Sequence, residues 1–146
     1  MPDLDAIFAP DGPLASAVPA FRARPQQLEM AQRIAAAIAY RDTLGLDATA
    51  CRLVHGEADG LPALVVDRYD DVLVIQTLCQ GMDRRTGAIV DALVDLVKPR
   101  GILARNDPKV RRLEALDERI EVLYGEVPDT VRVREGRIWH DVDVRQ

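Results

Sequence analysis

The spacing of apolar residues changes once along the chain, and this change limits the folds open to it. Between residues 24 and 46, apolar side chains recur at helical spacing, with Leu28, Ile34 and Ile38 on one stripe. From Cys51 onward apolar and polar residues alternate, and turn-forming residues interrupt them every few positions. The sequence therefore predicts one long helix followed by a strand-rich domain.

The order of the expected elements predicts the fold class. Strands are expected over 51–57, 62–71, 71–79, 100–107 and 120–126, a hairpin over 129–144, a central helix over 83–99 and a short helix over 108–116. Asp83 is the expected N-cap of the central helix, and Asn106 with Asp107 that of the short helix. Strands that cluster before and after a central helix predict an α+β fold with a mostly antiparallel sheet, preceded by the N-terminal helix.

Three segments are expected along the chain. Residues 1–23 contain four prolines, which forbid a long helix and predict an extended N-terminal arm. Residues 24–46 form the N-terminal helix. Residues 47–146 form the strand-rich domain.

The composition bears on the class of protein. The 146 residues carry a net charge of −5, which argues against a protein that coats nucleic acid non-specifically. No apolar run approaches the roughly 18–20 residues that a membrane helix needs, so no membrane partner is expected. Cys51 and Cys79 are too few for a disulfide framework; we expect buried free thiols and a reducing cytoplasm.

The charge is unevenly distributed. Residues 98–112, "KPRGILARNDPKVRR", hold six bases and one acid. Such a cluster predicts a phosphate-binding face, with a solvated rim as the alternative.

Motifs for catalysis are not found. The chain has no phosphate loop, no H-x-x-x-H and no C-x-x-C, and neither His55 nor His140 accompanies a nucleophile elbow. The acids of "RLVHGEADGLPALVVDRYDD" (52–71) suit turns that bond backbone amides, so this stretch is interpreted as a structural strand–turn–strand. Trp139 is expected in the core or an interface, with a base-stacking platform as the alternative. No catalytic, cofactor-binding or metal-binding residue is predicted.

Several linked stretches resemble a known family. They are "CRLVHGEADGLPALVVDRYDD" (51–71), "GILARNDPKVRRLEAL" (101–116) and "VLYGEVPDTVRVREGRIWHDVDVRQ" (122–146). Over about residues 31–146 the chain resembles the central domain of the class I SAM-dependent 23S rRNA (cytosine-C5) methyltransferases of the RlmI type. The resemblance implies a PUA domain before this segment and a Rossmann-like methyltransferase domain after it. The catalytic cysteine, its base and the S-adenosylmethionine site would then lie beyond Gln146, and this chain alone would be inactive.

The resemblance also implies an RNA-facing stretch and a 23S rRNA partner. The residues that match it, and that we expect to bind RNA, are Arg105, Asn106, Lys109, Arg111 and Arg112. The chain departs from the family pattern at Ala63 and Ala115, where glycine is usual, and at Ala104, where glutamate is usual. The first two departures bear on turn geometry, and the third removes an acid.

The N-terminal part resembles a different family. Residues 6–38 are similar to the start of DinG/YoaA-like helicases, through Phe21, Arg24, Gln27 and Met30. There Gln27 would read adenine, but no Walker A loop follows. A chimera joined near residues 30–38 would account for both resemblances.

Three functions remain open at this point. The first is a non-catalytic RNA-recognition and scaffold domain of a large-subunit rRNA methyltransferase. The second is a dimerisation module that binds no RNA, in which the N-terminal arm and helix supply the contact. A homodimer through a surface that a missing catalytic domain would cover is also expected. The third is a DinG-like helicase fragment.

Overall fold

The computed structural model describes residues 25–146 and, before them, only residues 3, 6, 9, 12 and 13. The arm expected over 1–23 therefore lies largely outside the described residues, as do Phe21 and Arg24. None of the described helices is long and apolar enough to cross a membrane.

Helix α3 (Pro25–Thr43) corresponds to the helix expected over 24–46. Its buried stripe includes Met30 and Ile34, which pack into the main core. The helix ends before Gly45, whose φ of +59° is a left-handed conformation that glycine adopts without strain.

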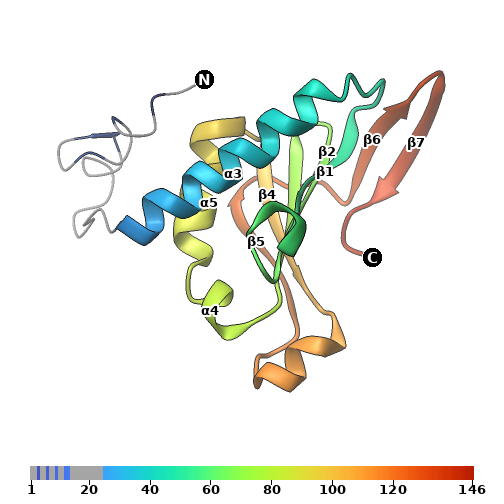
Figure 1. Ribbon diagram of the computed structural model, residues 1–146. Coiled ribbons are helices and arrows are strands. Elements are labelled where there is room, and N and C mark those ends of the chain that lie inside the picture. Colours follow the sequence, from blue (N-terminus) through green and yellow to red (C-terminus); the bar gives the residue numbers. More distant parts are fainter. Residues whose placement is uncertain (1–2, 4–5, 7–8, 10–11, 14–24) are drawn as a thin grey trace.

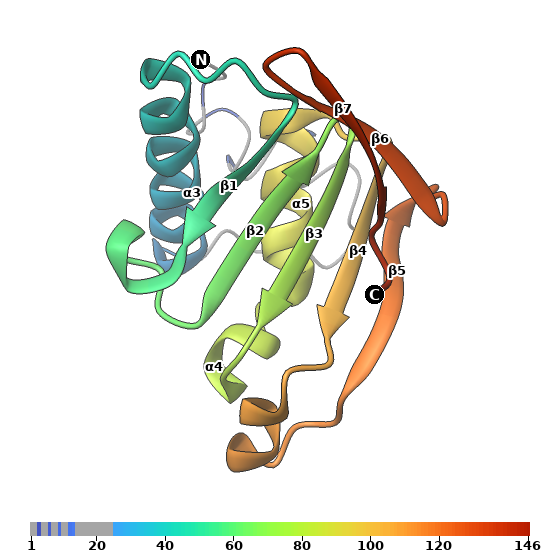
Figure 2. The same ribbon diagram turned by 90° about the vertical axis from the view of Figure 1, so that its right-hand side faces the viewer.

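A five-stranded sheet forms the centre of the molecule, in the order β1-β2-β3-β4-β5. Its strands are β1 (Ala50–His55), β2 (Leu64–Tyr69), β3 (Val72–Thr77), β4 (Gly101–Asn106) and β5 (Arg119–Gly125). All neighbours pair antiparallel except β3 and β4, which are parallel. Parallel neighbours need a crossover, and α5 (Thr86–Val97) supplies it (Figure 2).

Short helical segments connect the strands at one end of the sheet. They are the 3-10 helix η1 (Gly56–Asp59), the single turn α4 (Gln80–Asp83) and the 3-10 helix η2 (Lys109–Glu114). The expected N-caps are wrong. Arg85 caps α5 and Pro108 caps η2, neither with a side-chain bond, because the side chains of Asp83 and Asn106 bond to distant partners instead.

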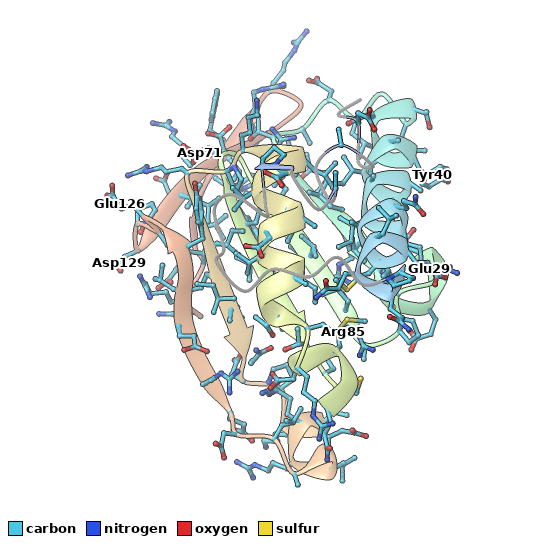
Figure 3. All side chains as sticks on the ribbon, turned by 90° about the vertical axis from the view of Figure 1, so that its left-hand side faces the viewer. Glu29, Tyr40, Asp71, Arg85, Glu126 and Asp129 are labelled. Atoms are coloured by element: carbon cyan, nitrogen blue, oxygen red, sulfur yellow. The ribbon has the colours of Figure 1, made fainter. Side chains whose placement is uncertain are left out.

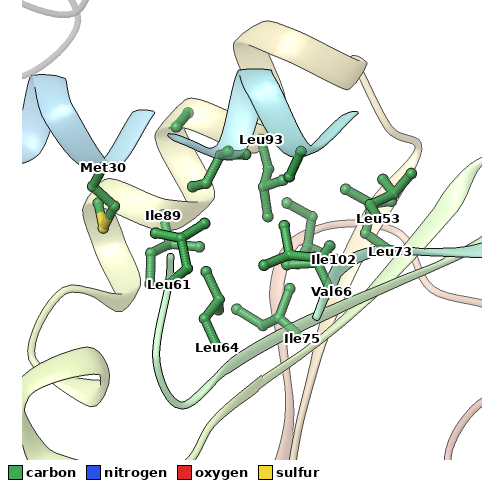
Figure 4. Close-up of a cluster of buried hydrophobic side chains, with 14 of the residues drawn as sticks. Met30, Leu53, Leu61, Leu64, Val66, Leu73, Ile75, Ile89, Leu93 and Ile102 are labelled. Carbon is green, nitrogen blue, oxygen red and sulfur yellow. The ribbon is translucent and has the colours of Figure 1, made fainter. Parts of the chain in front are cut away.

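Two layers cover the sheet. Helices α3 and α5 lie on one face, and the hairpin of β6 (Thr130–Glu135) and β7 (Ile138–Asp143) lies on the other (Figures 1 and 2). The larger core fills the helix side, where Leu64, Ile75, Ile89 and Ile102 are fully buried (Figure 4). A smaller core of valines and Leu103 lies under the hairpin.

The α+β class and the mostly antiparallel sheet are confirmed. The alternation of "DTVRVREGRIWHDVDV" forms the expected hairpin, with Glu135 paired to Ile138 across a two-residue turn. Gly136 begins this turn with a φ of +57°.

Candidate nucleic-acid interface

The predicted RNA-binding residues lie at the end of β4 and in η2. This segment projects beyond the sheet, as the orange turns below β4 and β5 in Figure 2 show. Lys109 and Arg112 are exposed on it, and Arg105, the second-last residue of β4, is half-buried. The structure therefore places the five residues in one region but exposes only part of them.

Arg111 is fully buried, which removes it from the surface that RNA could reach. Its Nη1 lies 3.0 Å from Asp83 Oδ1 and also donates to the Thr77 carbonyl, and its Nε donates to the Asp117 carbonyl at 2.9 Å. A guanidinium can be buried in this way because a carboxylate and carbonyls replace the lost water. Arg111 thus fastens η2 to α4 and to the end of β3.

Asn106 has a similar internal role. Its side-chain oxygen accepts the backbone N–H of Thr77 at 2.8 Å, and its amide nitrogen donates to the Thr77 hydroxyl at 3.1 Å. Asn106 is completely buried. Asn106 and Arg111 are thus both buried and bonded within the fold, and the expected contact of the five residues with RNA stays a prediction.

Arg105 is held by two partners on its own side of the sheet. It lies 3.2 Å from Asp107 Oδ2 and also donates to the carbonyl of Gln146. The hydrogen bond from Arg105 lowers the pKa of the Asp107 carboxyl.

The local charge of residues 98–112 is smaller in space than in sequence. Acids from other segments pair with three of its arginines: Glu126 with Arg100, Asp83 with Arg111 and Glu118 with Arg112. The acid of the stretch itself, Asp107, pairs with Arg105. Only Lys98 and Lys109 of this stretch have no acidic partner among the described residues. The structure adds two exposed arginines that the sequence reasoning missed, Arg84 and Arg85 beside α4.

The strand–turn–strand stretch is built around an ion pair that it makes with α3. Asp59 accepts two hydrogen bonds from Arg41, at 2.5 and 2.8 Å, and a third from the backbone N–H of His55 at 2.6 Å. Both side chains of the pair are nearly buried. The Arg41 hydrogen bonds lower the pKa of Asp59 below its ordinary value, although burial opposes them. These contacts hold the η1 turn against α3.

A second ion pair of this stretch joins β1 to β2. Asp67 accepts two hydrogen bonds from Arg52 on the neighbouring strand, at 2.7 and 3.1 Å, and Arg52 in turn lies 3.4 Å from His55 Nδ1. Burial raises the pKa of Cys51, which disfavours the reactive thiolate. Cys79 is a free, half-buried thiol.

The two alanines that replace glycine keep the turn geometry. Ala63 has a φ of +63° and Ala115 a φ of +53°, so both adopt the left-handed conformation that favours glycine. Ala104 is fully buried on the helix-facing side of the core. A glutamate there would need its own partner in that core.

Trp139 lies outside the core, with 53% of its surface exposed on the hairpin. The Arg132 guanidinium lies 5.4 Å from the centre of its ring, a cation–π distance. Of the residues that suggested a helicase, Met30 is buried in the main core, and Gln27 is half-buried at a polar hollow.

Curated proteins named ribosomal RNA large subunit methyltransferase I are similar to this chain. The chain is 34% identical to "Ribosomal RNA large subunit methyltransferase I" of Vibrio cholerae over 95% of its own length and 36% of that protein. It is 37% identical to the protein of that name from Aliivibrio fischeri, over 82% of its length and 29% of the relative. It is 40% identical to the protein of that name from Pseudoalteromonas atlantica, over 67% of its length and 25% of the relative. No family model matches the chain.

Solved structures share the fold at low sequence identity. A Streptococcus mutans protein assigned as a SAM-dependent methyltransferase superposes with a TM-score of 0.65 at 18% identity, over 80% of this chain and 30% of that one. A second protein assigned as a methyltransferase, solved with SAH, gives a TM-score of 0.57 at 18% identity, over 77% and 30% of the two chains.

These matches correct the expectation of a chimera. A similarity that covers 95% of the chain includes most of residues 6–38, so it does not begin near residue 31. The N-terminal segment therefore needs no origin separate from that of the rest of the chain. The chain spans about a third of the length of the curated relatives it matches, and over that length it is related to ribosomal RNA large subunit methyltransferase I.

Proposed function

We propose that this chain is a non-catalytic RNA-recognition and scaffold segment of an rRNA methyltransferase that acts on the large ribosomal subunit. The observation that carries the proposal is the 34% identity over 95% of the chain to an enzyme named for that activity, of which the chain spans 36%. The partner would be 23S rRNA in the cytoplasm.

The described side chains suit a structural, supporting role better than a catalytic one. Arg52, Asp59 and Asp67 of the 52–71 stretch are engaged in ion pairs, and burial raises the pKa of Cys51. S-adenosylmethionine would supply the methyl group in a part of the enzyme that this chain does not contain. The chain's own contribution would be a rigid sheet that holds η2, with Lys109 and Arg112 exposed on it, toward RNA.

Binding to an rRNA hairpin tests the proposal. Fluorescence anisotropy of a labelled hairpin, measured across a salt series, should show binding that weakens as salt rises. Each phosphate contact should contribute a slope of roughly −0.7 to −0.9 in log K against log salt. Absence of binding at about 50 mM salt, where such contacts are strong, would refute an RNA-recognition role. Calorimetry with S-adenosylmethionine should give no heat of binding to this chain.

Assembly without RNA is the second candidate, and edge strand β5 favours it. Ile120, Val122 and Tyr124 are between 40% and 43% exposed, on a strand that pairs with β4 alone. An exposed apolar edge strand is a known site of strand addition. Sedimentation velocity would separate the two candidates, because a dimer that forms equally with and without RNA supports assembly.

A further inference from the structure

Three cations without an acidic partner among the described residues lie on two short segments at one end of the sheet. Six described Arg and Lys residues have no carboxylate within 4.0 Å: Arg68, Arg84, Arg85, Lys98, Lys109 and Arg137. Arg84 and Arg85 directly follow α4, and Lys109 begins η2. Half of the unpaired cations therefore belong to two short segments that are 24 or more positions apart in sequence.

Gln80 joins these two segments. Its backbone N–H donates to Glu114 Oε2 at 3.2 Å, and its side-chain amide donates to the Glu114 carbonyl at 2.8 Å. The Oε1 atom of the same side chain accepts a hydrogen bond from Arg84 Nη2 at 3.4 Å. Gln80 thus connects Arg84 to η2. Residues 80–85 and 109–114 form one continuous surface, which we call the basic end.

Arg84 and Arg85 also line a polar hollow of about 380 Å³ between α4, α5 and α3. Gln26, Gln27, Gly81 and Gly87 contribute to its walls. Arg85 is held there by a 2.7 Å hydrogen bond to the Gly81 carbonyl, and Figure 3 shows it where α4 meets α5. Donor groups thus line a space large enough for a phosphate group.

The acids at this end are mostly engaged. Asp83 pairs with Arg111 and Arg119, and Glu118 pairs with Arg112. Glu114 accepts the Gln80 amide. Among the described residues, Glu114 and Asp117 have no cation within 4.0 Å, so three unpaired cations lie beside two unpaired carboxylates at the basic end, a small excess that attracts anions.

An apolar side chain stands among these cations. Leu113 is 86% exposed in η2, and Val110, three positions earlier, is 45% exposed. The buried Arg111 between them holds the segment against α4 and β3. A fixed projection with an exposed leucine and surrounding cations matches a nucleic acid that offers phosphates and the apolar faces of its bases.

We propose that the basic end binds the backbone of a looped rRNA segment, with Arg84, Arg85 and Lys109 on phosphates and Leu113 against an unstacked base. This inference rests on the proposed function and names its contact surface. It assigns two arginines that lie outside the resembling RNA-facing stretch.

Matched charge removal tests the phosphate contacts. The Arg84→Gln/Arg85→Gln variant and the control Lys98→Gln/Arg137→Gln each lose two unpaired cations, so they change net charge equally. With a hairpin that has an open loop, the first variant should lower the magnitude of the salt slope by roughly 1.4–1.8, the value for two phosphate contacts. The control should keep the slope of the unmodified chain.

Leu113→Ala tests the base contact. This exposed side chain should be removable without loss of the fold, which circular dichroism and the melting temperature check. We expect binding to the looped hairpin to weaken by roughly 15-fold, as when about two buried methylene-sized groups are lost from a contact, with the salt slope and the affinity for a fully paired duplex unchanged. Equal binding by the variant and the unmodified chain would overturn the base contact.

The outcomes separate the two proposals. If the unmodified chain binds RNA and the Arg84→Gln/Arg85→Gln variant behaves like its control, the basic end is not the contact surface, but the proposed function stands. If the unmodified chain binds no RNA, the proposed function itself fails. A Leu113→Ala change that alters sedimentation but not RNA binding would make η2 a protein contact and overturn the inference.

Discussion

Replacing Ala63 and Ala115 with glycine should stabilise the protein. Both alanines have positive φ values, +63° and +53°, at the turns that precede β2 and follow η2. A left-handed conformation costs an L-residue about 1–2 kcal/mol, because its Cβ approaches the following carbonyl oxygen. Glycine avoids that contact at each site.

The expected gain is smaller than the strain. Glycine has more conformational freedom in the unfolded chain, which offsets about 0.4–1 kcal/mol of the relief. The net stabilisation is therefore about 0.5–1 kcal/mol at each position. The two sites share no hydrogen-bond partner, since the Ala63 carbonyl bonds to Leu78 and the Ala115 N–H bonds to Arg112. The double variant should thus gain about 1–2 kcal/mol, because independent sites add.

Urea and thermal unfolding measure this gain. The double variant should melt roughly 2–8 °C higher, as its size implies. Ala58→Gly is the matched control: Ala58 is exposed in η1 and has no positive φ, so the change should cost about 0.5–1 kcal/mol. A double variant that is no more stable than the unmodified chain would show that these turns carry no strain.

Three other expectations concern ion pairs and the sheet edge. Arg111→Met should destabilise the fold by about 3 kcal/mol or more in urea, because it leaves Asp83 without its buried partner, and adding Asp83→Asn should recover part of that loss. Because the folded-state pKa of Asp59 is lowered, its stabilisation is complete above its ordinary pKa of about 4 and is lost as pH falls through the folded value. Urea midpoints should therefore decline less on acidification in Arg41→Met, and parallel declines would exclude this ion pair as the cause. Val122→Lys places a charge on edge strand β5 and should reduce self-association at high concentration, measured by sedimentation velocity. Unchanged self-association would show that β5 is not the contact.

Local patterns predicted most of the fold because they depend on residues close in sequence. The alternation around the Glu135–Gly136 turn and the helical stripe through Ile34 both gave elements at the expected places. Their boundaries shifted by a few residues, where backbone hydrogen bonding ends before the pattern does.

The candidate site was harder to predict because its chemistry depends on distant pairs. Asp83 looks like an N-cap in its local sequence, yet it bonds to Arg111, 28 positions away. The same bond removes Arg111 from the surface and leaves Arg84 and Arg85 without an acid, although Asp83 precedes them directly in sequence. A count of charges over residues 98–112 therefore misplaces the surface cations. It includes Arg111, which is buried, and leaves out Arg84 and Arg85, which are exposed.

The β6–β7 hairpin has a consequence for the order in which the chain can fold. Its tip is fastened to the segment between α3 and β1: Thr49 N–H donates to the Arg134 carbonyl at 2.9 Å, and Gly136 N–H donates to the Asp47 carbonyl at 2.8 Å. These partners are separated by more than 80 positions, so closing that loop is entropically costly until the sheet between them exists. The strands β1, β2 and β3 need only short turns and can pair first. The bonds of residues 47–49 to the hairpin then form only when nearly the last residues of this chain fold, which makes the hairpin the closing step of the fold.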